Sequence, residues 1–344
     1  EQIELQAQLQ TIPANTFKNC YSLTSVTLPE TVTEIGSQAF DGTRLSSMTM
    51  PLSLRSIDYL AFVNCGALES LTLNEGLETI GEGAFFGCPL KGTLTIPSSV
   101  SSIASEPFTY NMLDAFSVED ENARFSSASG LLVDQVSGTV VAVPALIQGS
   151  VQIPQGVRVI EKGAFWNCTL ITDITLPDTV TKIEDAAFRG CESLTSFTIP
   201  SSLEQLGQGV WESCSSLTDV EWPATIPVIP TDSFNNCTSL KHLILNEGIS
   251  DISEHAFSDC LSLEEVEIPD SVISIGQGAF RGCSSLTSAR IGKGVASIGS
   301  GVFAGCDALA SLSVDDACEM YHTDEHGVLF DKDMTEALFA PQAM

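Results

Sequence analysis

Eleven cysteines are the residues of this sequence with the most obvious capacity for chemistry. Thiolates can join in disulfides or hold zinc or an iron–sulfur cluster, and each of these needs cysteines that converge in space. Ten of the eleven instead occupy one position of a recurring phrase, three residues after its aromatic residue: Cys20, Cys65, Cys88, Cys168, Cys191, Cys214, Cys237, Cys260, Cys283 and Cys306. Side chains at one position of stacked repeats lie in a row and point the same way. We therefore expect free, buried thiols that fill space as small apolar groups.

Groups suited to catalysis are few and scattered. The histidines are His242, His255, His322 and His326. No Gly-x-Ser-x-Gly phrase, metal-binding histidine pair or phosphate-binding glycine loop accompanies them. Carboxylate pairs carry no information in a chain with 44 acidic residues. We expect no enzyme activity, no metal and no cofactor.

A repeat of 22 or 23 residues defines the elements that carry these side chains. Its clearest form is residues 275–283, Ile-Gly-Gln-Gly-Ala-Phe-Arg-Gly-Cys. The aromatic residue of this phrase recurs, with one longer step, at Phe17, Phe40, Phe62, Phe85, Phe108, Phe165, Phe188, Trp211, Phe234, Phe257, Phe280 and Phe303. An aliphatic residue lies five positions before each. A period of this length is typical of a solenoid, in which stacked units bury what one unit cannot.

Each repeat also contains a Leu-x-x-apolar-x-apolar run that is often followed by proline, as in residues 263–269. The alternation predicts a short half-buried strand, and proline ends it. A tight turn, an extended return leg and a compact corner follow, with little helix. Like strands would pair in parallel about 4.8 Å apart. We expect Gly36, Gly81, Gly276 and Gly299 to supply left-handed or crowded backbone at the corners.

The step from Phe108 to Phe165 is too long for two repeats and contains a different module. Residues 130–134 and 137–144 predict a β-hairpin, and residues 327–331 and 337–341 repeat it. We predict a single domain over residues 1–344, with repeat blocks at 1–113 and 151–312. A hairpin insert occupies 114–150 and a truncated second insert module 313–344. The chain has no initiator Met, and we expect it to be a piece of a longer protein.

The charge limits the partners. Lys and Arg number 14 and Asp and Glu 44, which gives a net charge of −30. Such a surface repels nucleic acid and anionic lipid. A hydrophobic content of 43% allows a large core, and no apolar run is long enough to cross a bilayer.

The solvent-facing strand positions change character along the chain. The first half presents serine and threonine, as at Ser47, Thr49 and Thr72. The second half presents the residues that we predict to bind a partner: Asp219, Glu221, His242, Ile244, Glu265, Glu267 and Arg290. Neighbouring like charges destabilise a sheet, so this cluster invites a functional explanation. A solvated charged face and a cation at Asp219, His242 and Glu265 are the alternatives.

The repeat resembles the BspA-like leucine-rich repeats of bacterial and protist surface proteins. Residues 263–283 match the unit of that family closely. Thr43 and Asn111 depart from it by replacing the cysteine, Trp211 by replacing the phenylalanine, and Lys91 by replacing a leucine. The resemblance implies a leucine-rich-repeat solenoid, a right-handed superhelix of the β/α type with short parallel strands on one face.

The same resemblance implies an exported protein, at the cell surface or secreted, that binds host proteins or other cells. The partner would be a protein or glycan, for example in host extracellular matrix, bound by a monomer through the strand face. The alternative is a structural spacer that projects another domain from the cell surface.

Overall fold

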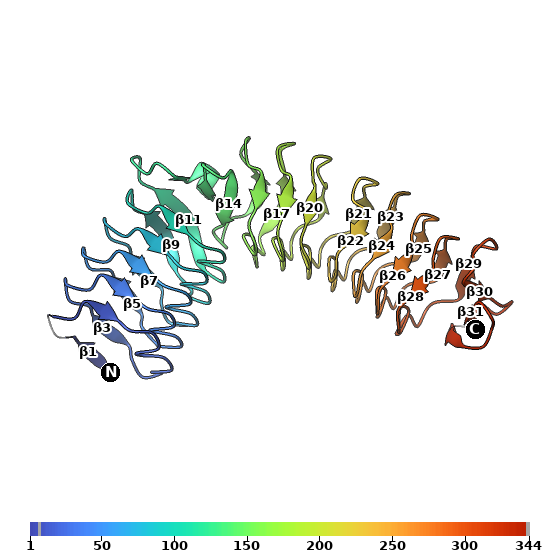
Figure 1. Cartoon of the computed structure of the whole chain (residues 1–344), viewed down its shortest axis with the longest axis horizontal. Coiled ribbons are helices and arrows are strands. Elements are labelled where there is room, and N and C mark those ends of the chain that lie inside the picture. The colour runs from blue at the N-terminus through green and yellow to red at the C-terminus, as the bar shows by residue number, and fades with distance from the viewer. Residues whose placement is uncertain (6–7, 342–344) are drawn as a thin grey trace. The chain divides into compact units, whose positions relative to one another are not determined.

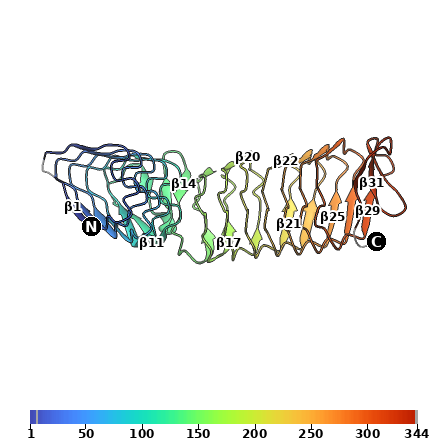
Figure 2. The same cartoon turned by 90° about the horizontal axis from the view of Figure 1, so that it is seen from below.

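The computed structural model describes residues 1–5 and 8–341. Contacts divide the chain into two compact units. Unit 1 comprises Glu1–Gln148 and Pro154–Cys168, and unit 2 comprises Gly149–Ile153 and the chain from Thr169 onward. Figures 1 and 2 show each unit as a stack of coils in which short strands are joined by turns and loops. The single domain over residues 1–344 stays a prediction.

One face of each unit carries the predicted strands. In unit 1 they are β1 (Gln2–Glu4), β3 (Ser25–Thr27), β5 (Ser47–Thr49), β7 (Ser70–Thr72), β9 (Lys91–Ile96) and β11 (Met112–Val118). In unit 2 they are β15 (Gly149–Gln152), β17 (Ile171–Thr175), β19 (Ser196–Phe197), β21 (Asp219–Trp222), β23 (His242–Leu245), β25 (Glu265–Ile268), β27 (Ser288–Ile291) and β29 (Ser311–Val314). Where neighbours pair, as β21 does with β23, they pair in parallel with equivalent residues opposite each other.

The return legs form a second ladder, which the sequence analysis missed because it expected one strand per repeat. In unit 1 these two-residue strands are β2 (Thr11–Ile12), β4 (Glu34–Ile35), β6 (Ser56–Ile57), β8 (Thr79–Ile80), β10 (Ser102–Ile103) and β16 (Val159–Ile160). In unit 2 they are β18 (Lys182–Ile183), β20 (Gln205–Leu206), β22 (Val228–Ile229), β24 (Asp251–Ile252), β26 (Ser274–Ile275) and β28 (Ser297–Ile298). Their aliphatic residues pair with the same residue of the next coil, as Ile35 does with Ile57.

Both predicted hairpins are present as antiparallel sheets. In unit 1, β12 (Phe125–Ser126) and η1 (Ala128–Gly130) precede the hairpin of β13 (Leu132–Asp134) and β14 (Thr139–Ala142). Strand β14 then pairs in parallel with β16, so the insert takes a place in the ladder of return legs. In unit 2, β30 (Tyr321–Thr323), β31 (Leu329–Asp331) and β32 (Ala337–Phe339) form the second module.

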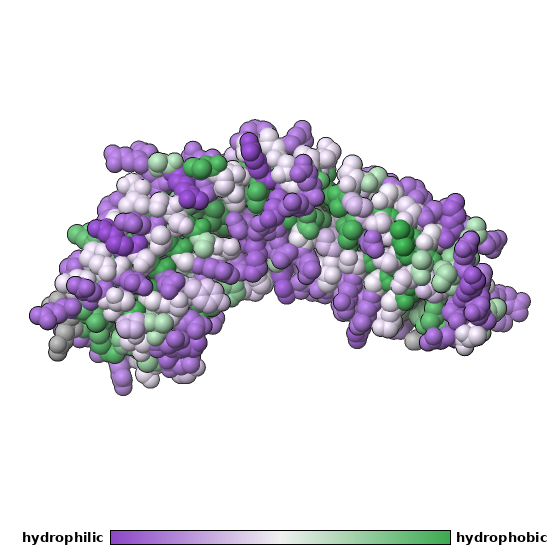
Figure 3. Space-filling model, in the orientation of Figure 1, coloured by the Kyte–Doolittle hydropathy of each residue, from purple (hydrophilic) through white to green (hydrophobic). Residues whose placement is uncertain are grey.

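The aromatic residues of the phrase form a stack through the core of each unit. Phe17, Phe40, Phe62, Phe85 and Phe108 stack in unit 1 with ring centroids 4.9–5.6 Å apart. Trp211 continues a similar stack in unit 2, with its ring 5.1 Å from Phe234 and nearly parallel to it. Each buried ring contributes about 1.5–3 kcal/mol. Figure 3 shows hydrophobic residues as a band between hydrophilic edges in each unit.

The corners depend on a backbone conformation that few residues adopt freely. In all twelve, the third and seventh residues after the aliphatic position have φ between 52° and 77°. Some are glycines, such as Gly83 and Gly87, and others are not, such as Leu60 and Ala186. The glycines named from sequence lie elsewhere and have no such φ, but they are crowded. A Cβ at Gly81 would lie 2.6 Å from the carbonyl carbon of Asp58.

Candidate functional site

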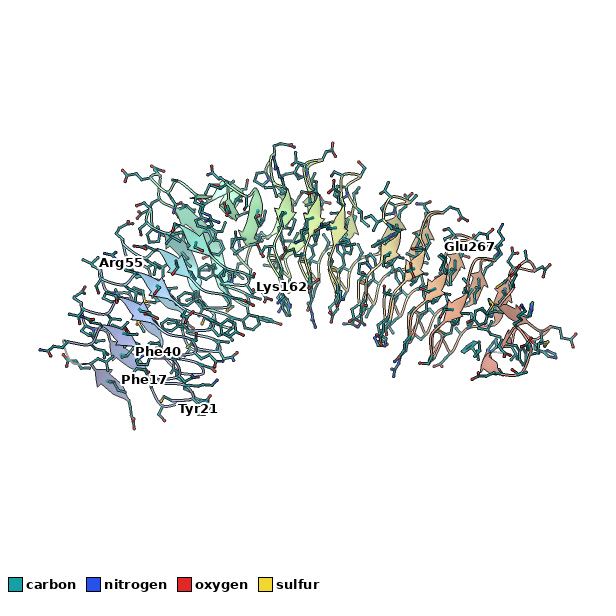
Figure 4. All side chains as sticks on the ribbon, in the orientation of Figure 1. Phe17, Tyr21, Phe40, Arg55, Lys162 and Glu267 are labelled. Carbon is teal, nitrogen blue, oxygen red and sulfur yellow. The ribbon has the colours of Figure 1, made fainter. Side chains whose placement is uncertain are left out.

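The structure places the seven predicted partner-binding residues on four strands of unit 2. Asp219 and Glu221 lie on β21, His242 and Ile244 on β23, Glu265 and Glu267 on β25, and Arg290 on β27. Asp219 is paired with His242, and Glu221 with Ile244. All point away from the core, Arg290 half-buried and the others exposed, because they alternate with buried or half-buried residues along their strands. Figure 4 marks Glu267 on this face.

Four of these residues line one depression of about 420 Å³, namely Asp219, Glu221, His242 and Ile244. Residues 196–199, Val220 and Pro223 complete its wall. Glu265, Glu267 and Arg290 do not line it. The structure therefore brings part of the predicted set together and leaves the rest along the neighbouring strands.

The depression lies where the strand face is interrupted. Strands β19 and β21 belong to different hydrogen-bonded sheets. Phe197 and Trp222 occupy strand positions that are aliphatic in most repeats. The Phe197 ring lies 4.8 Å from that of Trp211, and the Trp222 Nε1–H donates to the carbonyl of Ile226 at 2.9 Å. Sequence analysis missed Phe197, although its size at an aliphatic position was a usable signal.

The face around the depression carries unneutralised negative charge. Among the described residues, Asp219, Glu221, Glu265 and Glu267 form no ion pair. Asp219 accepts a hydrogen bond from the Thr218 hydroxyl at 2.5 Å. Glu221 accepts one from the Asn246 amide at 3.3 Å. Neither neighbour is a cation, so these carboxylates are free to attract a basic group.

The nearby basic residues are already engaged. Lys241 Nζ lies 3.1 Å from Glu264, and Arg290 Nη2 lies 2.7 Å from Asp315 and 3.9 Å from Asp270. The Arg290 guanidinium thus links its own coil to the preceding coil through Asp270 and to the following coil through Asp315. Its expected part in partner binding remains a prediction, with its charge neutralised internally.

Ser196, Asp219 and His242 share the depression, which raises the question of a hydrolytic triad. In such a triad the histidine lies between the serine and the carboxylate and is hydrogen-bonded to both. Here the strand that carries Asp219 separates those of Ser196 and His242. No hydrogen bond joins the three in the described part of the chain. The arrangement suits binding better than acyl transfer.

The geometry of the described residues gives little support to a metal site or to reactive cysteines. In residues 1–5 and 8–341, no group of three or more His, Cys, Asp or Glu side chains could hold a metal ion. All eleven cysteines are free. Burial raises the pKa of Cys214 to about 12, so this thiol stays protonated at neutral pH.

The buried thiols have a role that sequence analysis did not foresee. Seven of them donate to the carbonyl of the aromatic residue in the preceding coil, as Cys88 does to Phe62 at 3.0 Å and Cys237 to Trp211 at 3.2 Å. Cys168 donates to the carbonyl of Pro144 instead, and Cys318 to that of Val295. Cys20 differs, because it is exposed at the outer end of the stack in the first coil. The expectation that all ten are buried is therefore wrong for Cys20.

No helix in the described residues has the length and apolar character needed to cross a membrane.

A search among curated protein sequences found no match. Several solved structures are similar. A leucine-rich repeat protein from Eubacterium ventriosum has a TM-score of 0.80 at 24% identity, covering 92% of this chain and 86% of its own.

Two further structures show the same architecture. A leucine-rich repeat protein from Bacteroides ovatus has a TM-score of 0.58 at 26% identity, covering 91% of this chain and 86% of its own. A leucine rich cell surface protein from Faecalibacterium prausnitzii has a TM-score of 0.54 at 23% identity, covering 91% and 79%. These likenesses confirm the leucine-rich-repeat solenoid.

A sequence profile gives the family. The profile of the BspA type leucine rich repeat region matches six copies, over residues 1–114, 147–260 and 210–323. These ranges cover well over half of the chain and span both units. The chain belongs to the BspA-type leucine-rich repeat family.

Proposed function

We propose that this chain is a non-enzymatic scaffold, displayed at the cell surface, that binds a protein partner through the strand face of unit 2. The depression on β19, β21 and β23 is the observation that carries the proposal. It gathers Asp219, Glu221, His242 and Ile244 around a half-buried Phe197. The similar protein from Faecalibacterium prausnitzii, described as a cell surface protein, supports the location.

The chemistry of the depression favours a basic partner segment. Ile244 is 54% exposed, and together with Phe197 it offers apolar area. Asp219 and Glu221 offer negative charge without a paired cation. A segment with lysine or arginine beside an aliphatic side chain would satisfy both features. Long-range attraction from a chain of net charge −30 would speed its association.

The test measures the affinity of the chain for immobilised extracellular matrix proteins, which an adhesion scaffold is expected to bind. The variant Asp219→Asn, Glu221→Gln and Ile244→Ser should weaken binding at least about tenfold, since it removes two charge contacts and one apolar contact. Raising the salt concentration should weaken binding of the unchanged chain as well, because the contacts are electrostatic.

A matched control changes three exposed strand residues of unit 1, as Ser47→Asn, Thr49→Gln and Thr72→Gln. It should bind like the unchanged chain, with the melting temperatures of both variants preserved. Equal binding by the unit 2 variant and the unchanged chain would overturn the strand-face site. No binding to any matrix protein would favour the structural spacer instead. Light scattering would test the expected monomer of 36.5 kDa.

A further inference from the structure

The corners of unit 1 form a second surface, away from the strand face. Figure 4 shows Tyr21 and Lys162 along the same edge of this unit, opposite the edge that carries Arg55. At one end of the corner edge lies a depression of about 610 Å³, formed by the first three coils. Its lining includes the polar side chains of Asn19 and Asn64.

Tyr21 forms an exposed aromatic wall of this depression. It is 63% exposed, and its hydroxyl donates to Asn19 Oδ1 at 3.0 Å. Gly42 leaves the space open, since a Cβ there would lie 3.4 Å from both Asn19 Oδ1 and the Tyr21 ring. Arg44 also lines the depression, exposed, and forms no ion pair in the described residues.

The next three coils add an aromatic cluster to the same edge. The rings of Phe86 and Tyr110 meet edge-on at 5.2 Å, and those of Tyr110 and Trp166 are tilted at 5.3 Å. Tyr110 is 39% exposed. Earlier coils carry Lys18 and Asp41 at the position of Phe86. The cluster is therefore a local departure from the repeat rather than a part of its core.

Charged groups lie beside these rings. A Cβ at Gly163 would lie 3.2 Å from Glu106 Oε1 and 3.3 Å from Trp166 Cε3, so the carboxylate and the indole are neighbours. Lys162 Nζ lies 2.8 Å from Glu106 Oε2. A partly buried ion pair, with Lys162 as its more exposed member, thus lies beside the aromatic cluster.

The depression and the cluster lie next to each other on consecutive coils of the corner edge. The Gly42 N–H donates to the carbonyl of Val63 at 2.9 Å, and the Asn64 N–H donates to that of Phe86 at 2.8 Å. These bonds join consecutive coils at the corner edge. Asn64 lines the depression and Phe86 begins the cluster, so the two lie on neighbouring coils.

We propose that this corner edge of unit 1 binds an oligosaccharide. Aromatic rings stack on the apolar C–H faces of sugar rings, while amides, carboxylates and guanidinium groups bond to their hydroxyls. A protein hot spot would need a deep, water-excluding pocket, whereas the depression here is open and lined about equally by polar and apolar atoms. Nucleic acid is repelled by the net charge. The site is independent of the strand face of unit 2.

Tryptophan fluorescence gives a direct readout. Trp211 and Trp222 are fully buried, and Trp166 is half-buried, so acrylamide should quench mainly Trp166. The probes are neutral hexasaccharides of glucose and of N-acetylglucosamine and an acidic uronic acid hexamer. At least one should protect Trp166 from quenching and bind in calorimetry. Tighter binding of the uronic acid hexamer than of the neutral sugars would indicate that Arg44 binds one of its carboxylates.

Two variants and a control complete the test. The double variant Tyr110→Ala and Trp166→Ala should lower sugar affinity at least about tenfold, and Trp166→Phe should retain most of it. The control is Leu261→Ala, since Leu261 is exposed at the repeat position that Tyr21 occupies in unit 1.

The proposal is overturned if no probe protects Trp166, or if the double variant binds sugar as well as the control does. It is also overturned if a glycoprotein ligand binds this edge equally well after its glycans are removed. Circular dichroism and the melting temperature separate these outcomes from misfolding. Changes at Asp219, Glu221 and Ile244 should leave sugar binding intact.

Discussion

At the residue scale, the buried cysteines of the repeated phrase show one role that Cys20, exposed in the first coil, does not share. Buried thiols such as Cys88 donate to a carbonyl of the neighbouring coil. Thr43, which replaces cysteine in its repeat, lies 3.2 Å from the sulfur of Cys65. Asn111, the other replacement, donates to Phe108 at 2.8 Å. The position therefore selects a small side chain with a hydrogen-bonding group.

We predict that a thiol reagent will label one cysteine rapidly in the native protein. Cys20 is the exposed one, and the other ten are shielded from the reagent by burial. Denaturation without a reductant should raise the count to all eleven. Cys20→Ser should abolish the rapid phase. A denatured count near one would show that the thiols are paired.

We predict that Ala186→Gly stabilises the protein by about 0.5–1 kcal/mol, because Ala186 has a φ of 54° that glycine adopts without strain. Urea denaturation measures the change. Ala187→Gly is the matched control. Ala187 is buried and does not have a left-handed φ, so the Ala187→Gly protein should be less stable than the unchanged chain. A loss of stability in both variants would contradict the strain at Ala186.

At the element scale, the sequence predicts the repeated coil but not its left-handed corner residues or its second ladder of strands. The spacing of Phe280 and Cys283 is enough to predict a stacked corner, since ten of the twelve repeats have an aromatic residue and a cysteine at this spacing. The left-handed φ of Leu60 is invisible in sequence, because leucine rarely adopts it. The second ladder was missed because two residues such as Ser56 and Ile57 are too short for a periodic signal.

Much of the two candidate binding surfaces likewise could not be predicted from the sequence. The strand face follows from alternation, and so Asp219 and His242 were found. The contribution of Phe197 depends on a break between strands, which no pattern reports. The Phe86–Trp166 contact joins coils on either side of the hairpin insert. Only the structure brings those rings together.

We predict that Gly81→Ala destabilises unit 1 by about 1–3 kcal/mol, because the added Cβ would meet the Asp58 backbone at 2.6 Å. Gly66→Ala is the control, since its Cβ would meet nothing within 4 Å and its φ is not left-handed. Chemical denaturation should show little change for the control. Equal stabilities of the two variants would mean that the coils can move apart freely.

We predict that Asp134 makes the stability of the hairpin insert depend on acidic pH. Burial alone would raise the pKa of this carboxyl, but hydrogen bonds from Arg124 and from the Ser137 and Val136 N–H groups lower it overall. A lowered pKa means that the stabilisation is complete above about pH 4, the unfolded value, and is lost as pH falls through the folded pKa. Asp134→Asn should flatten that acid-side loss of stability. An unchanged slope would exclude Asp134 as its source.

At the whole-molecule scale, the net charge of −30 sets the balance between solubility and stability. Carboxylates such as Glu265 and Glu267, which form no ion pair in the described residues, repel each other. We predict that raising sodium chloride from about 10 mM to about 150 mM increases the melting temperature, because screening reduces this repulsion. The increase should shrink at about pH 5, where part of the carboxylates are protonated. Differential scanning fluorimetry measures both, and a fall in melting temperature would contradict the prediction.

The corner contacts join equivalent positions of consecutive coils in the same way along the stack. Phe257 stacks on Phe280, Ile252 pairs with Ile275, and Cys283 donates to Phe257. A coil can therefore be removed or duplicated in register, and the newly joined neighbours would meet the same contacts as before. The length of the scaffold, and with it the number of side chains on its faces, can change in whole coils while the design of the core stays the same.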